Sequence, residues 1–267
     1  MKVKEVTVSL SGVIPVVAYE NLRPGYSITI EVQDYDDHEA ILNDMNAYLR
    51  KVFDHASNGA KADLIAQQYA GIRLYDKDGR KYPSVTSILN YGKEWRVTED
   101  ELSQYAARGT IVGEMVETFL KTGKWPDPTT APALAEEVSI LLGGSLNMSW
   151  DQCSHKAFCE KYAKEIRVEA VQGTVFNDEA LYAGTFDIVG TYYGKRSLMD
   201  VKCGGWDMRQ LAAYAMCLEG IEQLVILPVG PTDNKCGYKK PVVCDTIQKE
   251  YEAFLKARAK FRQRFGL

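Results

Sequence analysis

Apolar and polar residues alternate along the first part of the chain, which is the pattern of half-buried β-strands. A turn at residues 23–25 precedes the last of three such runs, which cover residues 3–10, 12–20 and 26–32. Apolar residues then recur at helical spacing over residues 37–57, behind an aspartate-rich start that suits a helix N-cap. We therefore predict a small βββα module over residues 1–58, with the polar SNGA at 57–60 as its boundary.

Helical periodicity dominates the middle of the chain. Residues 59–82 are predicted to connect the first module to the rest through a helix and a hairpin that turns at Asp78-Gly79. Pro83 suits the start of a helix, and Gly123 suits the end of a long amphipathic one. The helices predicted in this part cover residues 61–70, 83–90, 99–123, 133–142 and 151–165.

Strand periodicity returns at Ile166, with the order strand, strand, strand, helix, strand, strand, helix. The nearly continuous apolar run at 221–229 predicts a strand buried on both faces, and Pro241 predicts an edge strand over 238–247. The other predicted elements are strands at 166–176, 181–193 and 196–203 and helices at 207–220 and 248–264. The pattern predicts an α/β (α+β) domain over residues 83–267.

Two aspartates and a lysine lie on neighbouring predicted strands, Asp187 on one and Asp200 and Lys202 on the next. Positions 200 and 202 are two apart, so their side chains point to the same face, and pairing through the short YGKR turn brings Asp187 near them. Such charges are expensive to bury together unless a divalent cation compensates them. Mg²⁺ usually takes one or two carboxylates plus water and phosphate oxygens, which fits this sparse set. Lys202 would then lie beside the water that attacks phosphorus.

The formal net charge of −4 is not that of a protein that coats nucleic acid, so any contact with nucleic acid must be local. The best local candidate is the basic run KARAKFRQRF at 256–265, for which a solvated helix end is the simpler interpretation. No window approaches about eighteen consecutive apolar residues, and the N-terminus lacks a signal-peptide core. We therefore expect a cytoplasmic protein that does not contact membranes.

The cysteines are scattered and lack the paired spacing of a zinc ribbon or a disulfide framework. We expect most of them to be free, partly buried thiols: Cys153, Cys159, Cys203, Cys217, Cys236 and Cys244. Cys153, His155 and Cys159 share one predicted helix, but a fourth zinc ligand is not evident. Cys203 follows Lys202 directly and is a candidate oxidation-sensitive thiol near the site.

Several stretches carry a resemblance to a known family, above all AGTFDIVG, LMDVKCG and QLAAYA at 183–190, 198–204 and 210–215. They resemble motifs of the PD-(D/E)xK nuclease superfamily, specifically its RecB-like branch, which includes phage exonucleases, CRISPR-associated adaptation nucleases and a mitochondrial single-strand exonuclease. Upstream, YPSVTSIL at 82–89 and ARGTIVGEMVE at 107–117 resemble the helical segment that precedes the core in that branch. The resemblance covers roughly residues 82–267 and implies an αβββαβ restriction-endonuclease-like core. It does not account for residues 1–58, although such a module would suit a phage or prophage member.

The resemblance implies a metal site at the charged residues of the neighbouring strands. Asp187 and Asp200 are implied as ligands of Mg²⁺ or Mn²⁺, with the main-chain carbonyl of Val201 as an additional ligand. Lys202 is implied as the catalytic lysine.

Further residues are implied around this site. Gln210 and Tyr214 are four apart, so they share one face of a predicted helix, and the resemblance makes them the accessory pair that positions DNA and the active-site lysine. Glu169, on the first strand of the block, falls near a carboxylate often seen in the family. Alternation in an exposed strand explains Glu169 equally well.

One position departs from the family pattern. RecB-like nucleases usually carry a histidine in a frame like RGTxVHxxxE, and this chain has Gly113 there. Glu117 lies one helical turn past Gly113, so we place it first as the substitute metal ligand and Glu114 second. The alternative is that both are solvated residues of an amphipathic helix. The histidines lie elsewhere and are expected at the surface: His38, His55 and His155.

The leading hypothesis is a Mg²⁺- or Mn²⁺-dependent deoxyribonuclease of a bacterial or phage-infected cell, acting in recombination, repair or DNA processing. An exonuclease acting on single strands or duplex ends is favoured, because the Gln-x-x-x-Tyr element belongs to the end-processing branch. Aromatic residues that either stack on bases or pack in the core are Trp95, Tyr105, Trp125 and Trp206.

Two other hypotheses remain. The competing one is a catalytically impaired DNA-binding or assembly subunit that retains the nuclease fold. Another assigns the N-terminal module to the recruitment of a recombinase, a single-strand-binding protein or a sister subunit, although the sequence has no binding motif there. A ring-shaped homo-oligomer would make digestion processive, and residues alone do not decide whether one forms.

Overall fold

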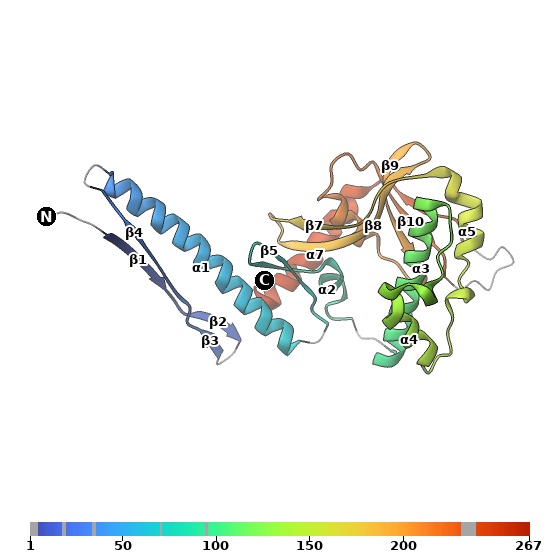
Figure 1. The fold of residues 1–267 in the computed structure, drawn as a ribbon, viewed down its shortest axis with the longest axis horizontal. Coiled ribbons are helices and arrows are strands. Elements are labelled where there is room, and N and C mark those ends of the chain that lie inside the picture. Colours follow the sequence, from blue (N-terminus) through green and yellow to red (C-terminus); the bar gives the residue numbers. More distant parts are fainter. Residues whose placement is uncertain (1–4, 18–19, 34–35, 70, 94–95, 231–238) are drawn as a thin grey trace. The chain divides into compact units, whose positions relative to one another are not determined.

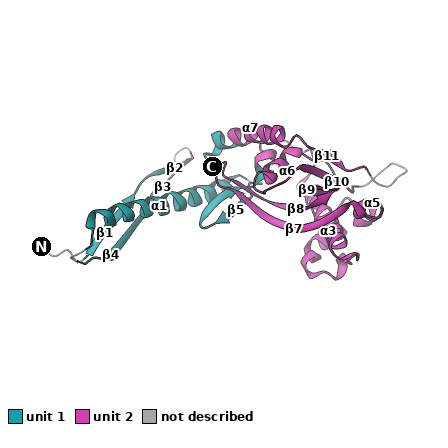
Figure 2. Cartoon of the chain, turned by 90° about the horizontal axis from the view of Figure 1, so that it is seen from above, with its two compact units in different colours: residues 1–87, 261–267 teal, residues 88–260 magenta. Residues whose placement is uncertain are grey.

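The computed structural model describes residues 5–17, 20–33, 36–69, 71–93, 96–230 and 239–267. Two compact units make up the chain, one of residues 1–87 with 261–267 and the other of residues 88–260 (Figure 2). Over these described ranges the fold is mixed α/β, with seven α-helices, a five-stranded sheet and three two-stranded pairs. No helix of the described residues is long and apolar enough to cross a membrane.

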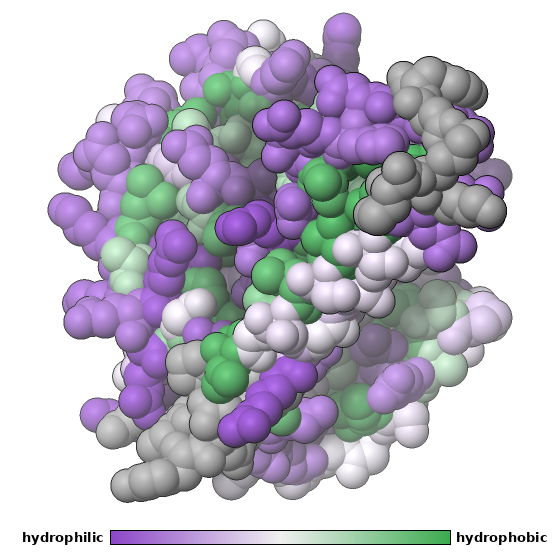
Figure 3. Space-filling model, turned by 90° about the vertical axis from the view of Figure 1, so that its left-hand side faces the viewer, coloured by the Kyte–Doolittle hydropathy of each residue, from purple (hydrophilic) through white to green (hydrophobic). Residues whose placement is uncertain are grey.

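The first unit contains a long antiparallel strand pair and a long helix. β1 (Glu5–Ser11) pairs with β4 (Gly25–Glu31) in unbroken register, and β2 (Ile14–Val17) pairs with β3 (Glu20–Leu22). Burial alternates along β1 and β4, and α1 (His38–Gln68) packs on this pair (Figure 1). The three predicted strands are present, and β3 is an additional one. Hydrophilic residues surround narrow bands of apolar ones on the face shown in Figure 3.

The predicted boundary at residues 57–60 is wrong, because α1 runs through it as one helix of 31 residues. Its start agrees with the sequence, since the side chain of Asp37 accepts hydrogen bonds from the amides of Glu39 and Ala40. The small residues at 57–60 do not interrupt the helix but allow another segment to pack closely against it. A Cβ on the buried Gly59 would lie 3.3 Å from the carbonyl oxygen of Gly79 in the following hairpin.

That hairpin consists of β5 (Leu74–Lys77) and β6 (Arg80–Pro83) and turns at Asp78-Gly79 as predicted. Both turn residues have positive φ, 53° and 78°, which an Asp-Gly pair adopts readily. The last residues of the chain complete the same unit. The ring of Phe265 contacts that of Tyr69 edge-on at 5.0 Å, and the Phe261 side chain is fully buried.

The helices of the second unit follow the predicted periodicity closely. The helices are α2 (Val85–Asn90), which begins in the first unit, α3 (Glu99–Thr122), α4 (Ala135–Gly143), α5 (His155–Tyr162), α6 (Met208–Ala215) and α7 (Ile247–Phe265), which ends in the first unit. α3 begins with a capping box between Thr98 and Glu101 and ends at Gly123, which has a φ of 72°. The predicted helix at 151–165 is α5 alone, because its flanks form 3₁₀ turns at Trp150–Gln152 and Ala163–Glu165. Further 3₁₀ turns are Pro128–Thr130 and Pro132–Leu134.

The five-stranded sheet has the order β11-β10-β9-β8-β7. Its members are β7 (Ile166–Asn177), β8 (Tyr182–Tyr192), β9 (Lys195–Lys202), β10 (Gln223–Pro228) and β11 (Val242–Cys244). β8 is antiparallel to both β7 and β9, β10 is parallel to β9, and β11 is antiparallel to β10. β10 is buried along its whole length and β11 lies at the edge, as predicted from the apolar run and from Pro241.

Helices cover both faces of this sheet. Apolar residues of α3 and α5, including Val112, Val116 and Phe158, form one core with Ile188 and Met199 of the sheet. On the opposite side, α6 and the adjacent part of α7 lie over the strands (Figure 2). The second unit is therefore a three-layer arrangement in which α3 and α6 approach the same strands from opposite faces.

We expect the close approach of β7 and β8 to make Gly190 indispensable for stability. A Cβ at this position would lie 2.1 Å from the main-chain oxygen of Arg167, so Gly190→Ala should destabilise the fold by about 1–3 kcal/mol. Urea unfolding followed by circular dichroism measures this. Gly109→Ala in α3 is the matched control, because nothing lies within 4 Å of its added Cβ, and it should raise stability by up to about 1 kcal/mol. Equal midpoints for the two variants would contradict the close approach.

Candidate active site

The two aspartates lie where β8 and β9 separate. Ile188 and Met199 form the last regular pair between these strands, so Asp187 and Asp200 occupy the next positions on either side. Instead of a main-chain ladder bond, the amide of Val201 donates to Oδ2 of Asp187 at 2.9 Å. The predicted pairing through the YGKR turn is therefore confirmed, and it brings both carboxylates to one point of the sheet.

Asp200 and Lys202 form a close ion pair between a buried carboxylate and a half-buried ammonium, as expected for two side chains on one face of a strand. Nζ of Lys202 lies 2.7 Å from Oδ2 of Asp200, and Asp200 is only 4 % exposed. Apart from this ion pair, Oδ2 of Asp200 has no hydrogen-bond partner. The pKa of Asp200 is raised, mainly because its carboxyl is buried. Lys202 lowers this pKa, whereas repulsion from Asp187 raises it further. Burial alone would lower the pKa of Lys202, but Asp200 and Asp187 hold it above its usual value.

Glu117 of α3 joins these carboxylates from the helix layer. Its side chain is 4 % exposed, and its pKa rises to about 8, first through burial and next through repulsion from Asp187. Glu114 and Asp200 also raise the pKa of Glu117, while a hydrogen bond from Gln172 lowers it. The structure thus brings Glu117, the first of the two proposed substitutes, together with both aspartates.

Glu114 lies at the edge of this cluster rather than inside it. It is half-buried, and its Oε1 accepts a hydrogen bond from Oγ1 of Thr118 at 3.3 Å. The space around Gly113, where the family's histidine would stand, is open, since nothing lies within 4 Å of an added Cβ. The helix face that carries Gly113 and Glu117 therefore has room beside the cluster.

Gln172 of β7 belongs to this site and was not predicted. It lies opposite Asp187, between the pairs Val171–Ile188 and Gly173–Phe186, and its φ of 50° is left-handed. In this left-handed conformation the side-chain amide of Gln172 points toward α3, and its Nε2 donates to Oε2 of Glu114 at 3.5 Å. The only signal in the sequence is the Gln-Gly pair inside a strand pattern, since glycine in a strand often marks an irregularity.

Glu169 is not part of the cluster. Its carboxylate pairs with Nε of Arg196 at 2.9 Å, and both side chains are largely exposed. It lies at the register shift between Val168 and Ala170, and it is not among the charges that affect Asp200 or Glu117. The surface-strand interpretation fits this position.

Gln210 and Tyr214 lie together on α6, as their spacing predicts. Nε2 of Gln210 donates to Oη of Tyr214 at 3.2 Å. Tyr214 is buried over β8, where a Cβ on Gly184 would lie 2.2 Å from its ring. The start of α6 is fixed by Asp207, which caps the helix and pairs with Arg209 at 2.6 Å. The accessory pair therefore approaches β8 three positions before Asp187, from the side opposite α3.

A pocket opens directly beside Lys202. It is lined by Lys202, Cys203, Gly204, Trp206, Pro228, Gly230 and Lys239. Trp206 is 39 % exposed, so its ring is available to a substrate, whereas Trp125 stacks on Phe119 at 4.2 Å in the core. Tyr105 is also exposed, and Trp95 lies outside the described residues.

Two predictions about other residues need correction. His155 is not at the surface: it is 1 % exposed, packs edge-on against Trp125 at 5.3 Å, and burial lowers its pKa. It faces inward because α5 packs against α3 and the ring of Trp125 covers this position. Arg258 of the basic C-terminal run is also buried, and it donates to the carbonyl oxygens of Ala180 and Leu181. The remaining cations of this run are exposed: Lys256, Lys260, Arg262 and Arg264.

The donor set fits a hard divalent cation with few protein ligands. In the parts of the chain that the structure describes, no group of three or more His, Cys, Asp or Glu side chains is arranged to hold a metal ion. Mg²⁺, however, is commonly held by one or two carboxylates with water and phosphate oxygens. Asp187 and Asp200 supply such a pair, and Oδ2 of Asp200 is a buried carboxylate oxygen without a hydrogen-bond partner. The roles of these carboxylates and of the Val201 carbonyl as ligands stay predictions.

No protein-family model matches this chain, and neither does any of the curated proteins.

The pKa of Glu117 makes stability pH-dependent in the absence of divalent cations. The unfolded chain loses this proton near pH 4.5, but the folded chain keeps it to about pH 8. The stabilisation is therefore complete below pH 4.5 and is lost as the pH rises through 8, by up to about 1.4 kcal/mol for each pH unit. Glu117→Gln should reduce this slope in chemical unfolding measured from pH 5 to 9 with a chelator.

The control for this measurement is Glu99→Gln, which changes an exposed glutamate of the same helix. It should follow the wild-type slope. A wild-type slope that Glu117→Gln leaves unchanged would show that the carboxylate is not buried among charges.

Proposed function

We propose that the second unit is a divalent-metal-dependent nuclease of the PD-(D/E)xK type that hydrolyses phosphodiesters of DNA. The observation that carries this proposal is the convergence of Asp187, Asp200, Lys202 and Glu117 at one point, the place where β8 and β9 separate. A buried charge cluster of this kind destabilises a fold unless a ligand compensates it. Packing alone gives no reason to keep it.

The order of elements supports the same proposal. α3, β7, β8, β9, α6 and β10 occur in this order along the chain, with α4 and α5 inserted between α3 and β7, and β10 joins the sheet parallel to β9 after the α6 crossover. This is the αβββαβ order that the resemblance implies, with the charged residues on the second and third strands. The fold of the second unit thus supports the nuclease type without the help of a known relative.

The position of each residue in this cluster suits a particular catalytic role. Asp187 and Asp200 would hold Mg²⁺ or Mn²⁺, with the carbonyl of Val201 and with Glu117 at the helix side. The cation, when bound, supplies stabilisation of the negative charge that develops on the phosphate oxygens. Lys202 has a raised pKa, so it is present as an ammonium that orients the attacking water and donates to phosphate oxygens.

Residues around this centre would bind the DNA strand. Trp206 presents a ring on which a base can stack, and Lys239 supplies a cation in the same pocket as Lys202. Gln210 and Tyr214 would support the substrate and the lysine from α6. These contacts provide local affinity for a strand in a protein whose net charge is −4.

Substitution of the charged residues tests the catalytic role. Asp200→Asn and Lys202→Ala should each lower Mn²⁺-dependent cleavage of end-labelled DNA by a factor on the order of 10²–10⁴. Circular dichroism should confirm that both variants are folded. Asp245→Asn and Lys195→Ala change exposed residues of the same types and should cleave like the wild type.

If the wild-type protein binds DNA but does not cut it with Mg²⁺ or Mn²⁺, the enzyme proposal fails. The impaired DNA-binding or assembly subunit would then be the better account.

Comparison of linear with circular DNA tests the preference for ends. The Gln210–Tyr214 pair favours end processing, so linear single strands and duplexes should be degraded while closed circles of the same sequence survive. Gel analysis over time measures this, and a nicked circle controls for entry at an internal break. Linearisation of closed circles would instead indicate an endonuclease.

A further inference from the structure

Two free cysteines contact each other next to the proposed catalytic lysine, Lys202. Cys153 lies at the start of the segment that leads into α5, and Cys203 follows Lys202 at the end of β9. Their sulfur atoms share a hydrogen bond at 3.9 Å, although the residues are 50 positions apart in the sequence. The fold, not local sequence, has brought these thiols into contact.

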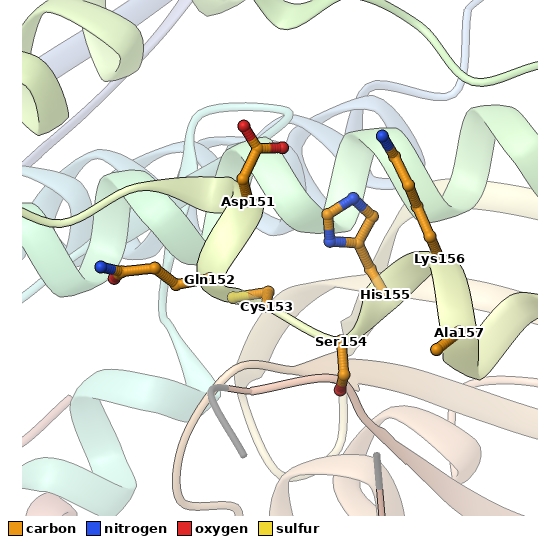
Figure 4. A pocket seen from close by; sticks show the side chains of 7 residues that line it. All are labelled: Asp151, Gln152, Cys153, Ser154, His155, Lys156 and Ala157. Carbon is orange, nitrogen blue, oxygen red and sulfur yellow. The ribbon is translucent and has the colours of Figure 1, made fainter. Parts of the chain in front are cut away.

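Each thiol lines a different pocket. Cys153 lies in a hollow whose lining comes from residues 151–157, and Figure 4 shows its side chain at the bend between Gln152 and Ser154. Cys203 lines the pocket beside Lys202 together with Trp206. A small oxidant can therefore approach the pair from the hollow, while the chemical change takes place next to the lysine.

The surroundings favour reaction at Cys153. Its pKa is lowered, mainly by the hydrogen bond with Cys203. Burial acts in the opposite direction, and the nearby cation of Arg108 lowers the pKa further. Arg108 is itself buried, and its Nε has no hydrogen-bond partner. A thiolate, not a thiol, is the nucleophile in reactions with peroxides.

We propose that Cys153 and Cys203 are a redox modification site, at which a hydroperoxide forms a reversible disulfide that displaces Lys202 and stops catalysis. The sulfur of Cys153 attacks one peroxide oxygen, which forms an S–O bond and breaks the O–O bond, and the other oxygen leaves with a proton as water or an alcohol. The sulfur of Cys203 then attacks the sulfenic sulfur, and an S–S bond replaces the S–O bond as water leaves. The two thiols lose two electrons, and the peroxide is reduced.

The expected effect on Lys202 follows from the packing of Cys203. A disulfide bond is about 2.0 Å long, so the two sulfur atoms must come closer together than they are in the structure. The main chain of Cys203 has little freedom, since a Cβ on Gly230 would lie 2.3 Å from its carbonyl oxygen. The carbonyl of Lys202 accepts a hydrogen bond from the amide of Val229 at 2.9 Å. Because Cys203 follows Lys202 directly, a pull on Cys203 strains these tight contacts and is passed to Lys202 through one peptide bond. A displacement of about 1 Å at a catalytic group can cost on the order of 100-fold in rate.

The inhibitory part of this inference rests on the proposed nuclease function, but the disulfide itself does not. The full-length protein is treated with hydrogen peroxide and then with dithiothreitol. Peptide mass spectrometry should find a Cys153–Cys203 linked peptide, lighter than the separate peptides by two hydrogen atoms, that disappears on reduction. Mn²⁺-dependent DNA cleavage should fall by about 100-fold on oxidation and return on reduction.

Cys153→Ser is the decisive variant, because it removes one partner without changing a residue that contacts the substrate. It should keep its cleavage activity in peroxide, whereas the control Cys244→Ser should lose activity like the wild type. Cys203→Ser should also abolish the linked peptide, which keeps the test valid if Cys153→Ser does not fold.

The outcomes separate the two proposals. Failure to find the linked peptide in oxidised wild-type protein would overturn the modification site, and a linked protein that still cleaves DNA at the full rate would overturn the switch. A reduced protein that never cleaves DNA would overturn the proposed function, while the linked peptide would still decide whether this modification site exists.

Discussion

The mutual repulsion of two buried carboxylates and a half-buried one is the constraint around which the second unit is organised. Asp187, Asp200 and Glu117 come from two strands and a helix, and burial together with this repulsion raises the pKa values of Asp200 and Glu117. Among the residues that the structure describes, Lys202 is the cation in direct contact with one of them, Asp200. The layers around the cluster, α3 on one face and α6 on the other, supply the apolar packing that offsets this unfavourable concentration of charge.

The irregular backbone around Asp187 follows from the same constraint. β8 packs against α6 and α7 at Tyr182 and against the α3 layer at Ile188, and Asp187 lies between these two parts. On one side of it Gln172 turns out of the strand conformation, and on the other its own side chain takes the amide of Val201. The sheet thus gives up regular pairing at Asp187, where polar side chains from two strands and a helix converge.

The sequence predicts the strands and helices of the second unit well, because apolar periodicity is strong there and a short turn joins β8 to β9. For the same reason the proximity of Asp187, Asp200 and Lys202 could be predicted, since it depends only on local pairing. The inward position of His155 and the part played by Gln172 depend on how α5 and α3 pack on the sheet, which periodicity does not contain. At residues 57–60 the small, polar composition favoured a break, but it serves the close approach of a hairpin to α1.

The division of the first unit has a consequence for how the protein is made. Residues 1–87 emerge from the ribosome long before residues 261–267, yet both belong to the same compact unit. Tyr69 cannot gain its contact with Phe265 until the whole second unit has been translated. The first unit therefore cannot be completed until the chain has passed through the whole second unit.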